Sequence, residues 1–84
     1  MPTALRIGLY RFYFYSYDCQ EPRHMHVDRD NLSAKLRLDP DVRMAENHGY
    51  NRRELREIEQ IARMHLEVLR DEWDAFCSGA AGTS

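Results

Sequence analysis

Apolar and polar residues alternate along the first half of the chain, a pattern that is typical of β-strands with one buried face. Four segments follow it: residues 5–7, 10–17, 24–29 and 32–39. The second segment is strongly aromatic, with Phe12 and Phe14 on one face and tyrosines on the other. The last two are separated by Asp30 and Asn31, which tolerate the left-handed backbone of a tight turn. We therefore expect a β-hairpin there.

A two-residue turn in this hairpin predicts its register, since directly opposed residues of an antiparallel pair share a face. His24 then lies opposite Arg37, and His26 lies opposite Lys35. The aliphatic side chains gather on the other face: Met25, Val27, Ala34, Leu36 and Leu38. A slip of one residue would destroy this separation, so the register is well specified. Both histidines are expected on the open, polar face of the sheet.

The segment after the hairpin has no strong periodicity. Pro40 stops the preceding strand because proline cannot donate a backbone hydrogen bond. Residues 42–46 are expected to form a helical turn, and residues 47–49 a reverse turn in which Gly49 is available for positive φ.

The last third of the chain has helical periodicity, with apolar residues at steps of three and four from Leu55 onward. Asn51 is a natural N-cap, and Glu54 completes a capping box. A continuous helix of about 26 residues would be about 39 Å long, whereas a strand here spans only about 20–27 Å. The helix should extend past its sheet and leave three apolar side chains without cover: Leu69, Trp73 and Phe76. Such surface usually marks a protein contact, so we expect a second copy or a small partner protein to cover it.

The predicted fold class is therefore α+β: a small antiparallel β-sheet of three to four strands packed on one long C-terminal helix. Residues 1–77 form a single domain, and residues 78–84 are expected to be a disordered tail because they are rich in small and polar residues.

The composition is that of an ordinary water-soluble domain, with 43% hydrophobic and 31% charged residues and a net charge of −2. No apolar run is long enough to span a membrane, so we expect a cytoplasmic protein without a membrane partner. Cys19 and Cys77 have no metal-ligand spacing. Two reduced thiols are the favoured interpretation in that compartment, with a single disulfide bridge as the alternative.

Several short motifs resemble the domain of unknown function 4160 family of small bacterial proteins, over residues 2–77. The most specific is Glu-Pro-x-His-x-His-Val, matched at Glu21, Pro22, His24, His26 and Val27. Others are residues 2–8, the aromatic strand, and the pairs and triplets at 34–35, 38–40 and 53–55. The resemblance implies a compact cytosolic domain that is often encoded beside a second small protein, in pairs suspected of being toxin–antitoxin modules. It implies no settled activity, cofactor or catalytic residue.

The paired imidazoles are the main candidates for chemistry, because histidine exchanges protons near neutral pH. In one hypothesis His24 and His26 are the catalytic base and acid of a small ribonuclease. A weaker form of it is RNA binding without cleavage, through the cationic and aromatic side chains expected beside them: Arg11, Tyr13, Tyr15, Lys35 and Arg37.

Two alternatives remain open at this point, and with them the question of whether the protein is an enzyme. His-x-His on a strand is a good chelating pair for zinc, but a site needs a third ligand. The candidates are Asp28, Glu21, Cys19 and His48, and no spacing compels any of them, so we assign no metal and no cofactor. In the remaining interpretation the histidines belong to a surface that binds a partner protein.

Overall fold

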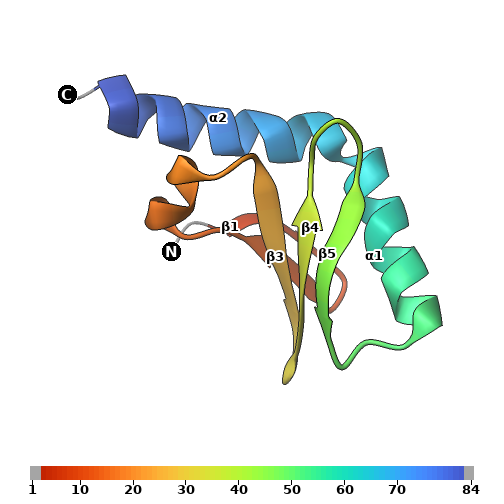
Figure 1. Cartoon of the computed structure of the whole chain (residues 1–84). Coiled ribbons are helices and arrows are strands. Elements are labelled where there is room, and N and C mark those ends of the chain that lie inside the picture. Colours follow the sequence, from red (N-terminus) through yellow and green to blue (C-terminus); the bar gives the residue numbers. More distant parts are fainter. Residues whose placement is uncertain (1–2, 83–84) are drawn as a thin grey trace.

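The computed structural model describes residues 3–82, with side chains up to residue 78, and it has the predicted α+β architecture (Figure 1). Within this part of the chain, five antiparallel strands form one sheet in the order β1-β2-β3-β4-β5. Their bounds are Thr3–Ile7 for β1, Tyr10–Tyr13 for β2, His24–Arg29 for β3, Leu32–Arg37 for β4 and Arg43–His48 for β5. The prediction of three to four strands was too low, and the strand it missed is β5.

β5 occupies the segment for which we expected a helical turn. Met44 lies opposite Leu36 and packs against the core, whereas Glu46 lies opposite Lys35 on the other face. A register shift between Lys35 and Leu36 accommodates the pairing. Such a short segment carries too little periodicity to distinguish a strand from a helix, and the free edge of β4 decided the outcome. Of the reverse turn predicted for residues 47–49, the positive φ of Gly49 is confirmed at 108°, whereas Asn47 and His48 belong to β5.

The β3–β4 hairpin is confirmed residue by residue. His24 pairs with Arg37 and His26 with Lys35, and Asp30 takes a left-handed φ of 55° in the turn. The aliphatic side chains of both strands are buried in the core as predicted: Met25, Val27, Ala34, Leu36 and, just beyond β4, Leu38.

The predicted long helix is two helices. α1 spans Arg52–Met64 and α2 spans Leu66–Gly82, and between them His65 has a non-helical ψ of 23°. The Asn51–Glu54 capping box at the start of α1 is confirmed. Figure 1 shows α1 beside β5, and α2 turning across the sheet toward the start of β3. α2 continues to Gly82, into the segment expected to be disordered, and residues 83–84 lie outside the described residues.

This break corrects the prediction that the helix end lacks intramolecular cover. Leu69 is fully buried and Trp73 is 4% exposed. The Trp73 ring packs on Phe14 with a centroid separation of 5.1 Å. Of the three side chains assigned to a partner, Phe76 alone remains partly open, at 39% exposure. The bend at His65 returns α2 to its own sheet, so most of this apolar stripe completes the core.

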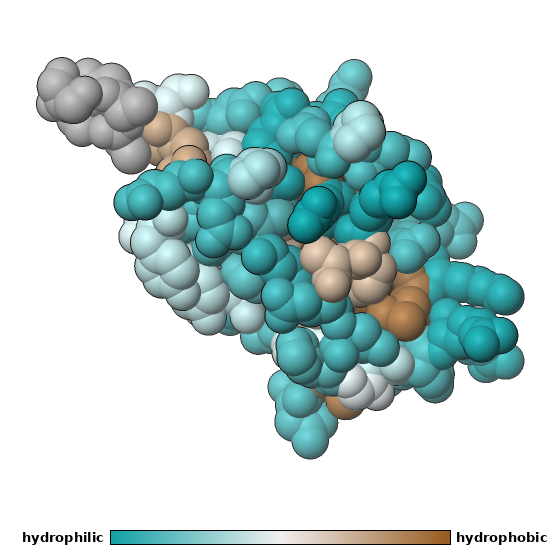
Figure 2. Space-filling model, in the orientation of Figure 1, coloured by the Kyte–Doolittle hydropathy of each residue, from teal (hydrophilic) through white to brown (hydrophobic). Residues whose placement is uncertain are grey.

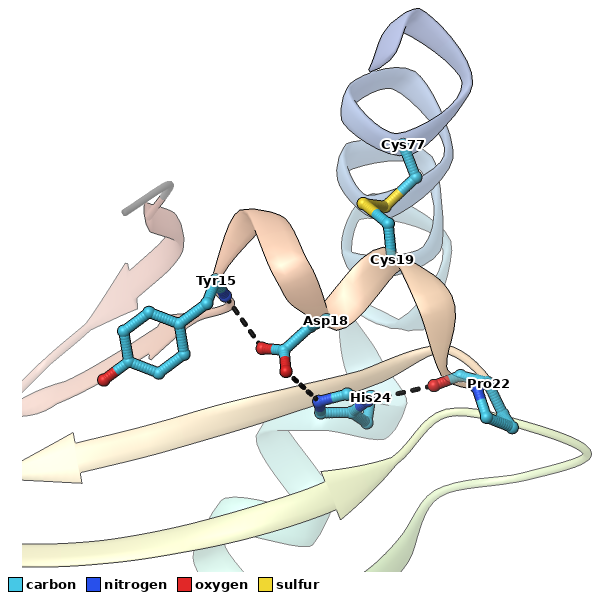
Figure 3. Close-up of a disulfide and its surroundings, with 6 residues drawn as sticks. All are labelled: Tyr15, Asp18, Cys19, Pro22, His24 and Cys77. Atoms are coloured by element: carbon cyan, nitrogen blue, oxygen red, sulfur yellow. Dashed lines mark hydrogen bonds and ion pairs between the residues drawn. A yellow bond between two sulfur atoms is a disulfide. The ribbon is translucent and has the colours of Figure 1, made fainter. Parts of the chain in front are cut away.

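The oxidation state of the two cysteines also differs from the favoured expectation, which was two reduced thiols. Cys19 and Cys77 form a disulfide across 58 residues of sequence (Figure 3). Cys19 lies in η1, a short 3-10 helix spanning Ser16–Gln20, and Cys77 lies on α2. Their spacing in the sequence gave no sign of this, because the tertiary path of α2 brings them together. The bridge ties η1 to α2.

Hydrophilic side chains predominate on the face of the molecule in Figure 2, where apolar residues form small separate patches. Across the described residues, neither helix combines the length and apolar character needed to cross a membrane.

Candidate functional site

The open face of the sheet brings together side chains from β2, β3, β4 and β5. Tyr13 pairs with His26, His26 with Lys35, and Lys35 with Glu46, so these residues form one row across the sheet. A shallow hollow of about 290 Å³ lies over this row. Its lining combines rings, one amine and one carboxylate with small groups: Tyr13, Tyr15, His26, Ser33, Ala34, Lys35, Glu46 and His48.

Tyr13 lies where predicted, but its ring is not available for stacking on a base. It is 6% exposed, with the Arg11 guanidinium 4.4 Å above its ring and the His26 ring stacked against it at 5.3 Å. Its hydroxyl donates to Asp28 at 3.0 Å. Burial, followed by hydrogen bonds with Tyr15 and Asp28, raises the pKa of Tyr13 well above its ordinary value. Tyr13 therefore supports the neighbouring side chains.

The accessible aromatic surface lies just after the end of β2, around the start of η1. Tyr15 and Tyr17 stack with parallel rings at 5.1 Å, and Tyr17 is 65% exposed. Tyr17 lies two positions after Tyr15, as Tyr15 does after Tyr13, so the alternation places all three on one face. The sequence could therefore have indicated Tyr17 as a candidate for stacking on a base.

The two histidines of β3 have different surroundings, which corrects the prediction that both are open. The His26 side chain is 23% exposed and borders the hollow. The His24 side chain is 2% exposed, and its ring packs against Trp73 of α2 at 5.0 Å. The register places both on the same face, but η1 and α2 cover only the start of β3.

Asp18 lies between the two imidazoles. Its Oδ2 accepts hydrogen bonds from the Tyr15 backbone N–H at 2.8 Å and from His26 Nε2 at 3.0 Å. Its Oδ1 lies 3.3 Å from His24 Nε2. Burial works to raise the pKa of Asp18, but the hydrogen bonds from Tyr15 and His26 and the two imidazoles outweigh it. The pKa of this carboxyl is therefore below its ordinary value, and the buried group is an anion at neutral pH.

His24 is held in one orientation by its backbone surroundings. Its Nδ1 donates to the Pro22 carbonyl at 2.9 Å, and its Nε2 lies 3.3 Å from Asp18 Oδ1; both contacts are drawn as dashed lines in Figure 3. The Nε2 contact lacks the geometry of a hydrogen bond. One donor atom from each of Asp18, His24 and His26 lies within 4.8 Å of the others. The structure thus assembles two imidazoles and one carboxylate, a donor set found in transition-metal sites.

Sequence reasoning missed Asp18, because it lies in a connection that has no strand or helix periodicity. The third ligands it considered have other partners. Asp28 accepts the Tyr13 hydroxyl, Cys19 is in the disulfide, and His48 lies 3.3 Å from Glu46. Glu21 lies near the cluster but pairs with Lys35 at 3.2 Å. The five-residue gap between Asp18 and His24 was the available signal, but such a gap is common by chance.

The burial of His24 bears on the hypothesis of metal-free RNA cleavage. That reaction needs both imidazoles to reach one phosphodiester, one as a base and one as an acid. The rings lie 5.2 Å apart, but His24 Nδ1 is engaged by Pro22 and its Nε2 faces Asp18. His24 therefore lacks the access that this mechanism requires.

Lys35 and Arg37 lie beside the cluster, as the register predicts. A second, smaller hollow of about 130 Å³ is lined by Glu21, Pro22, His24, Lys35 and Arg37. Lys35 borders both hollows, so one cation faces the two ends of the site.

One family model matches the chain, over residues 10–74, and its description is "Domain of unknown function (DUF4160)". No curated protein matches the chain, and neither does any solved structure.

Proposed function

Because the chain belongs to the domain of unknown function 4160 family, whose description assigns no activity, we propose from its own surface that it binds single-stranded RNA. The binding surface is the open face of the sheet, and the contact is mainly with phosphates. We propose further that this RNA-binding domain is one member of a toxin–antitoxin-like pair, as the family resemblance implies.

The unequal distribution of charge carries this proposal. On the open face, the strand register aligns the basic side chains Arg6, Arg11, Lys35 and Arg37 with the acidic side chains Asp28 and Glu46. The register also places Arg43 opposite Arg37, so the strand residues of this face are net positive in a chain whose net charge is −2. Asp18 and Glu21, which contact the histidines and Lys35, offset part of that charge. A cationic surface of this kind attracts the nucleic-acid backbone, and phosphate contacts dominate non-specific affinity.

The exposed Tyr17, stacked on the half-buried Tyr15, supports single-stranded rather than double-stranded RNA. Tyr15 and Tyr17 present stacked rings at the edge of this face, and unpaired bases stack on such surfaces. Binding without cleavage is the form of the hypothesis that we retain, since His24 is sealed beneath Trp73.

The proposal is tested with a fluorescently labelled oligouridylate and a series of salt concentrations. Arg6→Gln combined with Arg37→Gln removes two exposed cations from the face. We expect the affinity to fall several-fold, and the log–log slope of affinity against salt to become shallower by about 0.7 for each phosphate that is no longer neutralised. Arg56→Gln is the matched control, because Arg56 is an exposed arginine on α1. Absence of salt-dependent binding, or an equal loss of affinity with Arg56→Gln, would refute the proposal.

A second candidate function, partner binding, is favoured by exposed apolar side chains along the helices. Met64 is 72% exposed and Val68 44% exposed, and Phe76 lies further along α2. We propose that this surface contacts a small cognate protein or a second copy of the chain. Co-expression with the product of the neighbouring gene should give co-purification, which Met64→Glu with Val68→Glu should abolish. Leu9→Glu, at another exposed apolar position, should leave it intact. Sedimentation of the protein alone identifies self-association, and failure of both measurements contradicts this role.

A further inference from the structure

The RNA-binding proposal does not use the cluster of Asp18, His24 and His26, and this cluster contains an unusual atom. His24 Nε2 is buried, and it has no hydrogen-bond partner among the described residues. Asp18 Oδ1 lies 3.3 Å from it. A buried nitrogen without a partner costs free energy, so such an atom calls for an explanation.

The arrangement of hydrogen atoms on His24 supplies that explanation. The Pro22 carbonyl can only accept, so Nδ1 must carry a hydrogen atom. In a neutral imidazole Nε2 then has a lone pair and no hydrogen. This lone pair faces the carboxylate of Asp18, whose oxygen is itself an acceptor. Two facing acceptors in a buried place are stabilised by a cation between them, which is either a proton on Nε2 or a metal ion.

From this juxtaposition we propose that Asp18, His24 and His26 bind one divalent first-row transition metal ion, Zn²⁺ or Fe²⁺. The three donors are the carboxylate and the two imidazole nitrogens. Imidazole suits Zn²⁺ and Fe²⁺, and two histidines with one carboxylate are a recurrent set for both. The inference is independent of RNA binding.

The separations of the donor atoms fit such an ion. Metal–ligand bonds of about 2.1 Å at angles of 90–109° place neighbouring donors about 3.0–3.4 Å apart. Asp18 Oδ1 lies 3.3 Å from His24 Nε2 and Asp18 Oδ2 lies 3.0 Å from His26 Nε2, so each carboxylate oxygen faces one imidazole. One donor atom from each of the three residues lies within 4.8 Å of the other two, and binding requires the two histidine donors to approach further. His26 then carries its hydrogen on Nδ1, the alternative neutral tautomer.

The surroundings already orient these ligands. A ligating histidine usually donates its other ring N–H to a carbonyl or carboxylate, which is what His24 Nδ1 does toward Pro22. The Tyr15 N–H fixes the carboxylate of Asp18, and Trp73 shields His24. Cys19 adjoins Asp18, so the disulfide to α2 anchors the segment that supplies the carboxylate.

Three protein ligands leave at least one coordination position for an exchangeable ligand. His26 borders the hollow of about 290 Å³, and Lys35 lines the same hollow. An exchangeable ligand would reach the ion from this hollow, where the amine of Lys35 would favour a small anion or a phosphate oxygen and the carboxylate of Glu46 would oppose it.

The test uses the full-length, tag-free protein, stripped with EDTA and titrated with Co²⁺ and with Zn²⁺ alone. We expect one ion per chain, visible d–d absorption bands for Co²⁺, and a higher thermal midpoint with metal. His26→Asn should weaken binding at least tenfold, and so should Asp18→Asn. His48→Asn is the matched control, because His48 also lines the hollow but lies outside the cluster. It should bind metal as the unmodified protein does.

A substoichiometric ion in the folded protein would overturn the proposal, as would unchanged affinity in His26→Asn. Circular dichroism checks that each variant is folded. If a variant unfolds, paramagnetic Co²⁺ is added to the unmodified protein and followed by NMR. The resonances of His24 and His26 should broaden or shift strongly, whereas those of His48 should change less. Equal effects on all three would overturn the assignment.

Discussion

The surroundings of His24 differ from those of His26, although the two residues lie two positions apart on the same face of β3. His26 borders a hollow and keeps 23% of its side chain exposed. His24 lies under η1 and the Trp73 ring, with 2% of its side chain exposed. The local pattern of one strand places both residues identically. Segments before and after β3 then seal one and leave the other open.

This difference divides the face into two regions with different chemistry. His26, a ligand of the proposed ion, borders the solvent-exposed part of the face, where Lys35 offers a polyanion a cation to contact. Around His24 the ring is dry and oriented by Pro22 and Asp18, which suits a coordinated ion. Accessibility, rather than residue type, separates the two proposals.

The largest expected effect comes from removing the cover of His24. Trp73→Ala deletes a 4% exposed ring that contacts both His24 and Phe14, so we expect the free energy of unfolding to fall by about 3–5 kcal/mol. In urea denaturation, Phe76→Ala serves as the comparison, because the Phe76 side chain is 39% exposed and should cost less. In the Trp73 variant, diethylpyrocarbonate should modify His24 as readily as His26. Continued protection of His24 would show that η1 alone seals it.

Opening the Cys19–Cys77 bridge should have the next largest effect. Cys19→Ser with Cys77→Ser frees η1 from α2, and loss of a disulfide that closes a long loop costs about 2–4 kcal/mol. The midpoint of thermal unfolding should fall, and reduction of the unmodified protein should lower it similarly. Reduction of the serine variant supplies the control, since it should change nothing further. An unchanged midpoint in the variant would mean that packing alone holds η1 in place.

The smallest effect concerns an ion pair beside the sealed region. Arg23 binds Asp39 at 2.8 Å and also Asp74 of α2 at 2.8 Å. The hydrogen bond from Arg23 outweighs partial burial and lowers the pKa of Asp39 below its ordinary value of 3.8. The stabilisation is thus present above that value and is lost as the pH falls through the lowered pKa.

Asp39→Asn should therefore reduce the stability at pH 7 by about 1 kcal/mol or less, because the pair is partly exposed. Unfolding measured between pH 7 and pH 3 should show a smaller loss of stability for the variant than for the unmodified protein. Asp71→Asn, an exposed position on α2, is the control and should follow the unmodified protein. Identical pH profiles for Asp39→Asn and the unmodified protein would assign this ion pair no role in stability.

Much of the fold was predictable, and the missed elements share a cause. The register of the β3–β4 hairpin and the Asn51 cap follow from patterns within a few residues, and both are confirmed. β5 and the break at His65 were missed. In β5 the pairing edge of β4 overrode a weak local pattern. At His65 the periodicity continues across the break, so the sequence shows no helix stop signal there.

The candidate site was predictable in part. His26 and Lys35 lie together on the open face, as their register required. The burial of His24 and the approach of Asp18 were not predictable, because no fixed spacing relates a loop carboxylate or a distant tryptophan to a strand. Tyr13 was correctly placed beside His26, but its cover by Arg11 follows from a side-chain conformation that the pattern does not specify.

The amino-acid sequence by itself determined which side chains share a face of the hairpin and where the first helix begins, since alternation and capping act between near neighbours. Only the tertiary structure decided which of the two imidazoles meets solvent and which meets Asp18. That choice depends on the turn at His65, which sends α2 over the start of β3, and on the Cys19–Cys77 bridge, which joins η1 to it. Contacts between residues far apart in sequence leave no periodic signal, and they create the environment on which the chemistry of these side chains depends.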